Sequence, residues 1–242
     1  MSKGRVALVT GGTRGIGRAI CEGLMNSGYR VVASYNSNDD AASRFAEETG
    51  IPVYKFDVSS FEQCAETVSR ISKDVGSVEV LVNNAGITRD TTMHRMDADQ
   101  WGAVIDTNLS GCFNMSRAVI DAMREAGFGR IVNISSINGQ AGQYGQVNYA
   151  AAKAGVLGFT RALALESAGK GITVNAIAPG YVDTEMVRQV PPSVLEKIVA
   201  RIPVGRLGRA EDIARGVLFL AHDGADYITG TTIDINGGQL MG

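Results

Sequence analysis

The sequence has few of the residues that build metal sites and disulfide frameworks. Among 242 residues there are 2 histidines and 3 cysteines, and Cys21, Cys64 and Cys112 lie far apart within helix-like patterns. An odd and scattered set of cysteines predicts reduced core side chains rather than disulfides or a cysteine nucleophile. His94 and His222 are distant in the sequence and belong to no metal-binding pattern. We therefore expect no metal site.

The sequence also lacks a strong charge bias and long apolar runs. Its net charge is −2 with both signs interspersed, so it offers no electrostatic surface for nucleic acid. No apolar run approaches the ~20 residues of a membrane span, and the first apolar run is too short for a signal peptide. We expect a soluble cytoplasmic protein that binds neither nucleic acid nor a membrane, with a substantial core formed from its 45% hydrophobic residues.

Short β-branched runs alternate with longer helical patterns along the whole chain. This order predicts an α/β fold, a Rossmann-type doubly wound parallel sheet of seven strands with helices on both faces. No linker divides the sequence, so residues 1–242 are predicted to form a single domain. The expected strands are Val6–Thr10, Arg30–Ser34, Val53–Asp57, Val78–Val82, Arg130–Ser135, Ile172–Ala176 and Thr231–Ile235.

Proline is scarce, and four of the five prolines lie between Pro179 and Gly208, around a short helical pattern at Val194–Ala200. We interpret residues 180–208 as a mobile substrate lid. A rigid excursion that packs on a neighbouring subunit would have the same composition. The sequence leaves both interpretations open.

A glycine-rich turn follows the first predicted strand and precedes a helical pattern. From Gly11 to Gly17 it has the spacing Gly-x-x-x-Gly-x-Gly. Glycines let the backbone approach a pyrophosphate, and the N-terminus of the next helix attracts negative charge. The spacing differs from the Gly-x-Gly-x-x-Gly dinucleotide fingerprint and also lacks the Gly-Lys-Ser/Thr ending of a nucleoside triphosphate loop. A cofactor site is therefore expected, and phosphoryl transfer is disfavoured.

Tyr149 and Lys153 are four residues apart, so a helix would place both on one face, about 5.4 Å apart along its axis. A free phenol has a pKa near ~10, and a neighbouring cation lowers that pKa. Tyr149 can therefore serve as a general acid. Taken alone, the pair is more often part of an ordinary helix, so it needs independent support.

Support comes from the predicted topology. Ligands of doubly wound sheets bind beyond the carboxyl ends of the strands. The residues that end or follow a predicted strand include Thr10, Asp57, Asn83, Ser136 and Pro179. These motifs should therefore meet at one edge of the sheet.

Taken in order along the chain, these motifs resemble those of the short-chain dehydrogenase/reductase family. They are the turn from Thr10 to Gly17, Asn83-Asn84-Ala85-Gly86, Asn108, Ser136, Tyr149-x-x-x-Lys153 and Pro179-Gly180. The resemblance implies a nicotinamide-dependent oxidoreductase whose catalytic residues are Asn108, Ser136, Tyr149 and Lys153.

The family also implies a role for each of these four residues. Tyr149 would protonate a substrate carbonyl, and Ser136 would hydrogen-bond the same oxygen. Lys153 would lower the pKa of Tyr149 and bind the nicotinamide ribose, while Asn108 would hold a water of a proton relay. Both residues also have a structural alternative: Ser136 can be an ordinary hydroxyl at the end of a strand, and Asn108 can be an amide at a kink in a helix.

The second predicted strand ends without a carboxylate, although an NAD-specific site usually has one there. Tyr35 and Asn36 occupy that place, and Arg14 and Arg44 are cations that can reach an extra phosphate. We therefore expect NADP(H) as the cofactor. Asp39 and Asp40 come later and should open the next helix.

By family likeness Asp57 contacts the adenine, although it can also cap the helix that begins near Ser60. The predicted cofactor-binding residues are Gly11, Thr13, Arg14, Gly15, Ile16, Gly17, Ser34, Tyr35, Asn36, Asp57, Val58, Asn84, Ala85, Gly86, Tyr149, Lys153, Pro179, Gly180 and Val182.

More particular strings resemble the family members that reduce 3-oxoacyl thioesters to (3R)-hydroxyacyl products. They are Asn83 to Asp90, Val104 to Asn108, Gly139 to Gln146, Asn148 to Gly155 and Leu240 to Gly242. Three of them, Val104 to Asn108, Gly139 to Gln146 and Leu240 to Gly242, imply acetoacetyl-CoA as the acyl-CoA substrate, in polyhydroxybutyrate synthesis. The implied substrate-binding residues are Asp90, Ser136, Gln143, Tyr144, Gln146, Tyr149 and Tyr181, with bulky Tyr144 favouring a four-carbon acyl group.

Alternatives remain at this stage. A reductase of 3-oxoacyl-[acyl-carrier-protein] would use the same chemistry, and steroid, sugar or polyol reductases are weaker rivals. In the stretch Arg124 to Gly129, neutral residues stand where a basic cluster for an acidic carrier would continue, but Arg161 and Lys170 stay available. A non-catalytic binding or scaffolding member would have no chemical need for all four catalytic residues.

The family resemblance also implies an assembly. Helices around Leu109–Ala126 and Tyr149–Ser167 would pair across two-fold axes into a homotetramer.

Overall fold

The structure is a computed structural model that describes residues 4–184, 187 and 192–241. Seven strands form one sheet in the order β3-β2-β1-β4-β5-β6-β7, and every neighbouring pair is parallel. The predicted α/β class and the predicted parallel sheet are confirmed. The strands are β1 (Val6–Val9), β2 (Arg30–Tyr35), β3 (Val53–Lys55), β4 (Val78–Asn83), β5 (Gly129–Ile134), β6 (Ile172–Pro179) and β7 (Thr232–Ile235).

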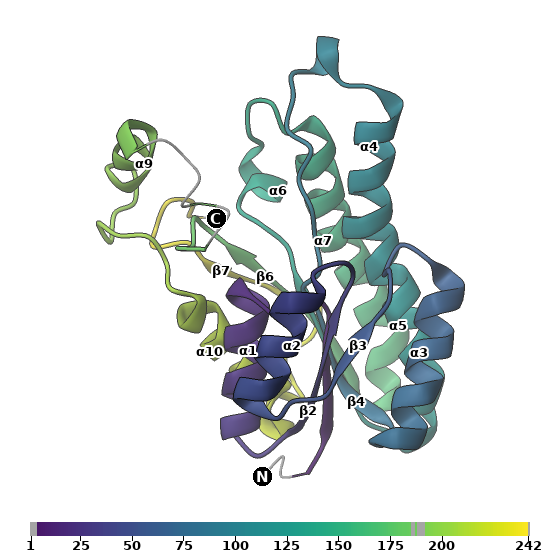
Figure 1. Cartoon of the computed structure of the whole chain (residues 1–242). Coiled ribbons are helices and arrows are strands. Elements are labelled where there is room, and N and C mark those ends of the chain that lie inside the picture. The colour runs from purple at the N-terminus through teal and green to yellow at the C-terminus, as the bar shows by residue number, and fades with distance from the viewer. Residues whose placement is uncertain (1–3, 185–186, 188–191, 242) are drawn as a thin grey trace.

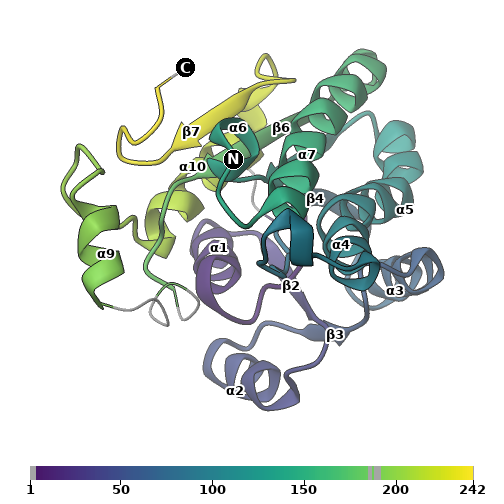
Figure 2. The same ribbon diagram turned by 90° about the horizontal axis from the view of Figure 1, so that it is seen from above.

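Helices cover both faces of the sheet (Figure 1). Helices α1 (Gly15–Asn26), α2 (Asp39–Thr49) and α10 (Ala210–Ala221) pack on one face. Helices α3 (Phe61–Asp74), α5 (Gly111–Ala126) and α7 (Val147–Ser167) pack on the other. Figure 2 shows the two layers from above, with α4 (Ala98–Ile105) beside α7. The short helices α6 (Asn138–Ala141) and α9 (Pro192–Val199) follow β5 and β6.

Each face of the sheet has its own apolar core. Phe45 and Leu24 are fully buried on the α1 face, and Met115 and Ile71 are fully buried on the α5 face. Burial of one such side chain contributes about 1.5–3 kcal/mol relative to its exposure to water. Because the central strands are buried on both faces, their carboxyl ends are held in fixed positions.

Side-chain caps explain where several helices begin. The Asn38 side chain accepts a hydrogen bond from the Ala41 N–H at the start of α2, and the Ser60 side chain caps α3 by accepting from Gln63. Such caps satisfy backbone donors that have no partner inside the helix. The predicted starts at Asp39 and near Ser60 are confirmed.

Two strand boundaries differ from the predicted ones by more than one residue. Strand β3 ends at Lys55 rather than Asp57, because the Asp57 carboxylate accepts hydrogen bonds from the Ser59 N–H and hydroxyl and turns the chain. Strand β6 continues beyond Ala176 to Pro179, because β7 pairs with it along that stretch. The Pro179 carbonyl then accepts from the Ile137 N–H at 2.9 Å, which fixes the segment after β5 against β6.

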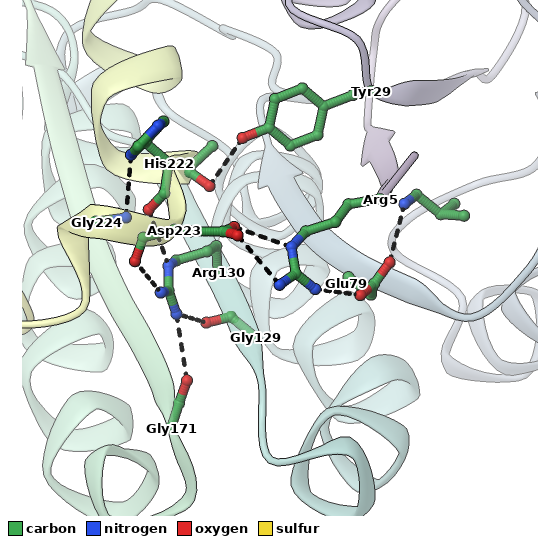
Figure 3. Close-up of polar contacts among 11 residues, drawn as sticks. Arg5, Tyr29, Glu79, Gly129, Arg130, Gly171, His222, Asp223 and Gly224 are labelled. Carbon is green, nitrogen blue, oxygen red and sulfur yellow. Dashed lines mark hydrogen bonds and ion pairs between the residues drawn. The ribbon is translucent and has the colours of Figure 1, made fainter. Parts of the chain in front are cut away.

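Charged residues at the amino ends of the strands are satisfied within the protein (Figure 3). Arg130, only 2% exposed, donates to backbone carbonyls of Gly129, Gly171, His222 and Asp223. Arg5 forms ion pairs with Glu79 and Asp223. The guanidinium groups of Arg5 and Arg130 lie 3.5 and 4.3 Å from the centre of the Phe128 ring.

In the described part of the chain, no helix has the length and apolar character needed to span a membrane. The three cysteines are buried and carry free thiols, as predicted for core residues.

Candidate active site

A cavity of about 970 Å³ opens at the carboxyl ends of the strands. Every predicted cofactor-binding residue lines it, from Gly11 in the glycine turn to Val182 after β6. Of the predicted catalytic residues, Ser136, Tyr149 and Lys153 line it directly. The structure therefore gathers motifs that span most of the sequence at one edge of the sheet.

The glycine turn between β1 and α1 requires glycine for identifiable reasons. Gly11 and Gly15 have φ of 61° and 52°, a region that side chains rarely adopt. A Cβ on Gly17 would stand 2.1 Å from the Gly11 carbonyl oxygen, so only glycine fits there. Helix α1 begins at Gly15 with no acidic residue in its first turn, which leaves its N-terminus attractive to an anion.

The turn is fastened to the segment after β4. The Thr10 hydroxyl oxygen accepts hydrogen bonds from the N–H groups of Asn84 and Ala85, at 2.9 and 3.0 Å. The Asn84 side-chain amide donates in return to the carbonyls of Thr10 and Gly11. These reciprocal bonds hold two walls of the cavity in one arrangement.

Tyr149 and Lys153 both belong to α7, which brings them one turn apart. The Lys153 ammonium lies 5.6 Å from the centre of the Tyr149 ring and donates to the Ile134 carbonyl at 2.8 Å. Lys153 is 4% exposed, so its charge faces the cavity in a largely desolvated position. The Tyr149 hydroxyl makes no hydrogen bond to the residues that the structure describes, which leaves it available to a ligand.

Ser136 follows β5 and is buried, 8% exposed. Its hydroxyl oxygen accepts a hydrogen bond from the Asn138 N–H at 3.1 Å. The adjacent Ser135 hydroxyl donates to the Lys153 carbonyl at 2.8 Å and fastens β5 to α7. This bond sets Ser136 and Lys153 in a fixed relation.

Asn108 lies in a π-helical turn, Asp106–Ser110, between α4 and α5, and it does not line the cavity. Its amide is fully buried, accepts from the Ile87 N–H at 2.8 Å and donates to the Ile87 carbonyl at 2.9 Å. A Cβ on Gly86 would stand 3.1 Å from Asn108 Oδ1 and 3.6 Å from Lys153 Nζ. The Asn108 amide therefore lies next to Lys153 while it positions the loop after β4.

The predicted substrate residues fall into two groups. Ser136, Gln146, Tyr149 and Tyr181 line the cavity, and burial raises the pKa of the Tyr181 phenol. Asp90, Gln143 and Tyr144 do not line it, and Tyr144 is 86% exposed.

Asp90 is nevertheless tied to the site. Its carboxylate accepts from the Gln146 amide at 2.7 Å, and the Gln146 side-chain oxygen accepts from Asn138 at 2.9 Å. The three side chains therefore link the loop after β4, the start of α7 and the segment after β5.

The predicted lid, residues 180–208, is anchored at its base. The Gly208 N–H donates to the Tyr181 carbonyl, and the Asp183 N–H donates to the Gly208 carbonyl. Further along, the Val204 N–H donates to the Gly237 carbonyl. The predicted helix is present as α9, one to two residues earlier than expected, while residues 185–186 and 188–191 lie outside the described residues.

Sequence reasoning missed several residues that line the cavity. Ser37, Asn38, Ile87, Thr88, Arg89 and Asn138 are examples. Each follows a recognised motif or the end of a strand by a few residues, so strand position was a signal that could have identified them.

The cavity fits an extended dinucleotide. It runs from the segment after β2, past the glycine turn, to Tyr149 and Lys153 on α7. A Cβ at Gly17 would clash with the Gly11 carbonyl and the Asn84 amide, so the turn presents bare backbone at the edge of the cavity. Among the described residues, no group of three His, Cys, Asp or Glu side chains is placed to hold a metal ion.

Comparison with known proteins agrees with this geometry. A family model described as enoyl-(acyl carrier protein) reductase matches residues 11–239. Acetoacetyl-CoA reductases of Rhizobium meliloti and Shinella zoogloeoides are 63% and 64% identical to this chain, over 98% of it and 99% of each relative.

More distant matches share the same architecture. A 3-oxoacyl-[acyl-carrier-protein] reductase of Pseudomonas aeruginosa is 47% identical over 99% of this chain and 98% of its own length. A solved structure of a proposed gluconate dehydrogenase from Agrobacterium tumefaciens superimposes with a TM-score of 0.94 at 34% identity, over 98% of this chain and 96% of the other.

Proposed function

The chain belongs to the short-chain dehydrogenase/reductase family, and from this premise we propose that it reduces acetoacetyl-CoA to (3R)-3-hydroxybutyryl-CoA with NADPH. One observation carries the proposal. Ser136, Tyr149 and Lys153 line the same cavity as the glycine turn, in a chain that matches acetoacetyl-CoA reductases over nearly its full length.

The residues around Tyr149 suit the reduction of a carbonyl. Bound in the cavity, the nicotinamide would supply the hydride to the 3-oxo carbon. Tyr149 donates its phenol proton to the carbonyl oxygen, and the Ser136 hydroxyl donates a hydrogen bond to the same oxygen. The nearby Lys153 ammonium stabilises the negative charge that develops on the phenol oxygen.

Asn108 is proposed to hold a water that returns a proton towards Lys153. Its position beside Gly86, close to the Lys153 ammonium, supports this role. The two hydrogen bonds to Ile87 support a structural role for Asn108 as well. They occupy one donor and one acceptor site of the amide, so its oxygen and its nitrogen can each make a further hydrogen bond to a water.

The remaining cavity residues suit a nicotinamide dinucleotide phosphate. The N–H groups at the start of α1 would bind the pyrophosphate, and Lys153 would bind the nicotinamide ribose. Asp57 and Val58 would contact the adenine. Arg14, in the glycine turn, would bind the 2′-phosphate at the end of β2, where Tyr35 and Asn36 stand in place of a carboxylate. Arg44, on α2, does not line the cavity and would reach the phosphate from outside its wall.

For the substrate we propose that Gln146 and Tyr181 contact the acyl group from the cavity wall. Tyr144 and Gln143 lie outside that wall, so their proposed contact requires a bound thioester that extends beyond the cavity. Residues 180–208 are proposed to close over it as a lid.

The proposed setting is polyhydroxyalkanoate synthesis in the cytoplasm, with the enzyme as a homotetramer. Phe113 on α5 and Leu165 on α7 are 49% and 85% exposed, which supports pairing of these helices between subunits. Light scattering that gives a monomer would contradict the tetramer.

The test is to follow NADPH oxidation with acetoacetyl-CoA and with acetoacetyl-carrier protein at equal concentrations, with NADH in parallel. Preference for the CoA ester and NADPH is expected. Preference for the carrier thioester would assign the enzyme to fatty-acid synthesis, which the identity to 3-oxoacyl-[acyl-carrier-protein] reductases makes the second candidate. Absence of oxidation with either substrate would contradict the proposed function.

A further inference from the structure

A cluster of three side chains, Tyr35, Asp39 and Lys55, lies at the end of β2 and is called the Asp39 cluster here. The Lys55 ammonium donates to both carboxylate oxygens of Asp39, at 2.9 and 2.8 Å, and the Tyr35 hydroxyl donates to one of them at 3.0 Å. Tyr35 and Lys55 are register partners on β2 and β3, while Asp39 opens α2. Three elements therefore meet at one carboxylate.

The Asp39 cluster borders the cavity. Tyr35, which belongs to the cluster, lines the cavity, and so do Asn38, the residue before Asp39, and Phe56, the residue after Lys55. Asp39 and Lys55 do not line it themselves. The Asp39 carboxylate is therefore carried by the residue next in the chain to the wall at which the proposed function puts the 2′-phosphate.

An uncompensated carboxylate at this position would repel a 2′-phosphate and would leave a ribose hydroxyl unaffected. Hydrogen bonds from Lys55 and Tyr35 lower the pKa of Asp39, so this carboxylate is ionised at neutral pH. Lys55 supplies the opposite charge at contact distance. Consecutive Cα atoms are about 3.8 Å apart, so Asp39 and Lys55, each next in the chain to a lining residue, lie near enough to the cavity wall for their charges to act within the Debye length of about 8 Å.

A purely structural purpose explains the Lys55–Asp39 pair less well. Both side chains are more than half exposed, at 52% and 60%, and exposed ion pairs contribute little to the free energy of unfolding. The start of α2 does not need the pair either, because Asn38 already caps it. The main physical consequence of the pair is the cancellation of charge at the end of β2.

We propose that Lys55 is a specificity-determining residue for the cofactor, acting through Asp39: by neutralising this carboxylate, it lets the end of β2 accept a 2′-phosphate. The inference rests on the proposed use of NADPH. It means that discrimination between NADP(H) and NAD(H) depends on a residue of β3 as well as on the residues that end β2.

The test measures dissociation constants of NADP⁺ and NAD⁺ by calorimetry, without substrate, because the two ligands differ only in the 2′-phosphate. Lys55→Gln is expected to lower the ratio of NADP⁺ affinity to NAD⁺ affinity three- to tenfold, through the loss of NADP⁺ affinity. Lys55→Arg should retain the ratio. Lys73→Gln, which removes the same charge from the last turn of α3, is the matched control and should leave it unchanged.

The double variant Lys55→Gln/Asp39→Asn decides whether Lys55 acts through Asp39. Its ratio should return to that of the unmodified protein, and Asp39→Asn alone should not lower the ratio. An unchanged ratio in Lys55→Gln would overturn the proposal. A double variant as poor as Lys55→Gln would do the same, because Lys55 would then act on the phosphate itself.

Failure of the proposed function would look different. Absence of acetoacetyl-CoA reduction, or an unmodified protein that prefers NAD⁺, would contradict that proposal. The change in the ratio between variants would still report on Lys55.

Discussion

The two ends of the sheet use polar residues in opposite ways. At the amino end, the Arg130 guanidinium is buried and bonded to four backbone carbonyls, and Arg5 is paired with two carboxylates (Figure 3). At the carboxyl end, the Tyr149 hydroxyl has no partner in the described protein and faces a cavity of about 970 Å³. At the amino end, polar groups bonded within the protein stabilise the fold. At the carboxyl end, polar groups are available to bind a ligand.

The contrast follows from which backbone groups are unpaired at each end of the sheet. Helices α1, α3 and α10 begin near the carboxyl ends of the strands, so their N-terminal N–H groups face that edge. At the amino end, the chain presents carbonyls from the ends of helices and the starts of strands, which suit a buried cation. Substitutions at the two ends should therefore separate activity from stability.

The largest effect is expected from Tyr149→Phe at the carboxyl end. This change removes the transferable proton and a hydroxyl that has no partner among the described residues, so kcat should fall about 10²–10⁴-fold. The dissociation constant for NADPH and the midpoint of unfolding should stay nearly unchanged. Stopped-flow assays, calorimetry and denaturant titration measure the three quantities.

Tyr227→Phe is the matched control, because the Tyr227 side chain is fully exposed. Its kcat should equal that of the unmodified protein. Retention of turnover in Tyr149→Phe would show that another group supplies the proton. A large loss of stability in that variant would contradict the contrast between the two ends.

The converse result is expected from Arg130→Met at the amino end. The variant removes the guanidinium that bonds to four backbone carbonyls, one bond buried and three part-buried, which should lower the free energy of unfolding by about 2–4 kcal/mol. The kcat of the folded fraction should change less than twofold. Urea titrations at one fixed protein concentration measure this change, so that the proposed assembly contributes equally to both proteins.

Arg70→Met serves as its control. Arg70 is exposed, and its guanidinium lies 4.8 Å from the centre of the Tyr54 ring. Loss of this contact should change stability by less than about 1 kcal/mol. If Arg130→Met were as mild as Arg70→Met, the amino end would not be the stabilising end.

An intermediate loss of stability is expected from Asp212→Asn. Asp212 lies at the carboxyl end of the sheet, but its carboxylate is bonded to other groups of the protein. Its carboxylate accepts from the Arg209 N–H at 2.8 Å and from Arg206 at 2.9 Å, and it pairs with Arg215. The backbone bond from Arg209, aided by Arg206, lowers the pKa of Asp212. Its substitution should therefore reduce stability, as at the amino end, by about 1 kcal/mol at pH 7.

The pH dependence gives the sign of this effect. A carboxyl whose pKa is lower in the folded state than the unfolded value near ~3.9 stabilises the protein above that value. The contribution is lost as the pH falls through the lowered pKa. The stability difference between Asp212→Asn and the unmodified protein should therefore vanish at acidic pH, while Glu211→Gln, in the same helical turn, should show a smaller difference at neutral pH.

The features of the fold that depend on local pattern were predictable from sequence. Strand–turn–helix order identified the sheet, and residues that follow strands, such as Ser136 and Pro179, were correctly placed at the cavity. Residues whose role depends on distant backbone were not predictable. Arg130 bonds to the carbonyls of His222 and Asp223, more than 90 positions away, and no pattern around Arg130 indicates them.

The same limit applies to residues around the cavity. Lys55 meets Asp39 only because β3 pairs with β2 in one register. Likewise, the bonds from Asn108 to Ile87 depend on the path of the loop after β4. The exposure of Tyr144 also depends on the path of its loop, which the motif shared with the family does not specify.

The smallest effect is expected for the thiols, which lie in the layers between the two ends. Burial raises the pKa of Cys64 to about 12 and that of Cys112 to about 11, and it raises the pKa of Cys21 above its usual value. Because the thiolate is the reactive form, iodoacetamide at pH 8 should label none of the three in the folded protein and all three in denaturant.

Cys21 makes this a test of the contrast, because its sulfur lies just beneath the glycine turn: a Cβ on Gly12 would stand 2.9 Å from it. If the glycine turn closes the cavity on the side of Cys21, iodoacetamide should not reach this thiol. Cys21 should then be as unreactive as Cys112, with or without NADPH. Arg130→Met should accelerate labelling of all three thiols by increasing the unfolded population, whereas Tyr149→Phe should not. Rapid labelling of Cys21 alone in the unmodified protein would show that the carboxyl end is loosely packed below its ligand site, and the separation of stability from ligand binding would then fail.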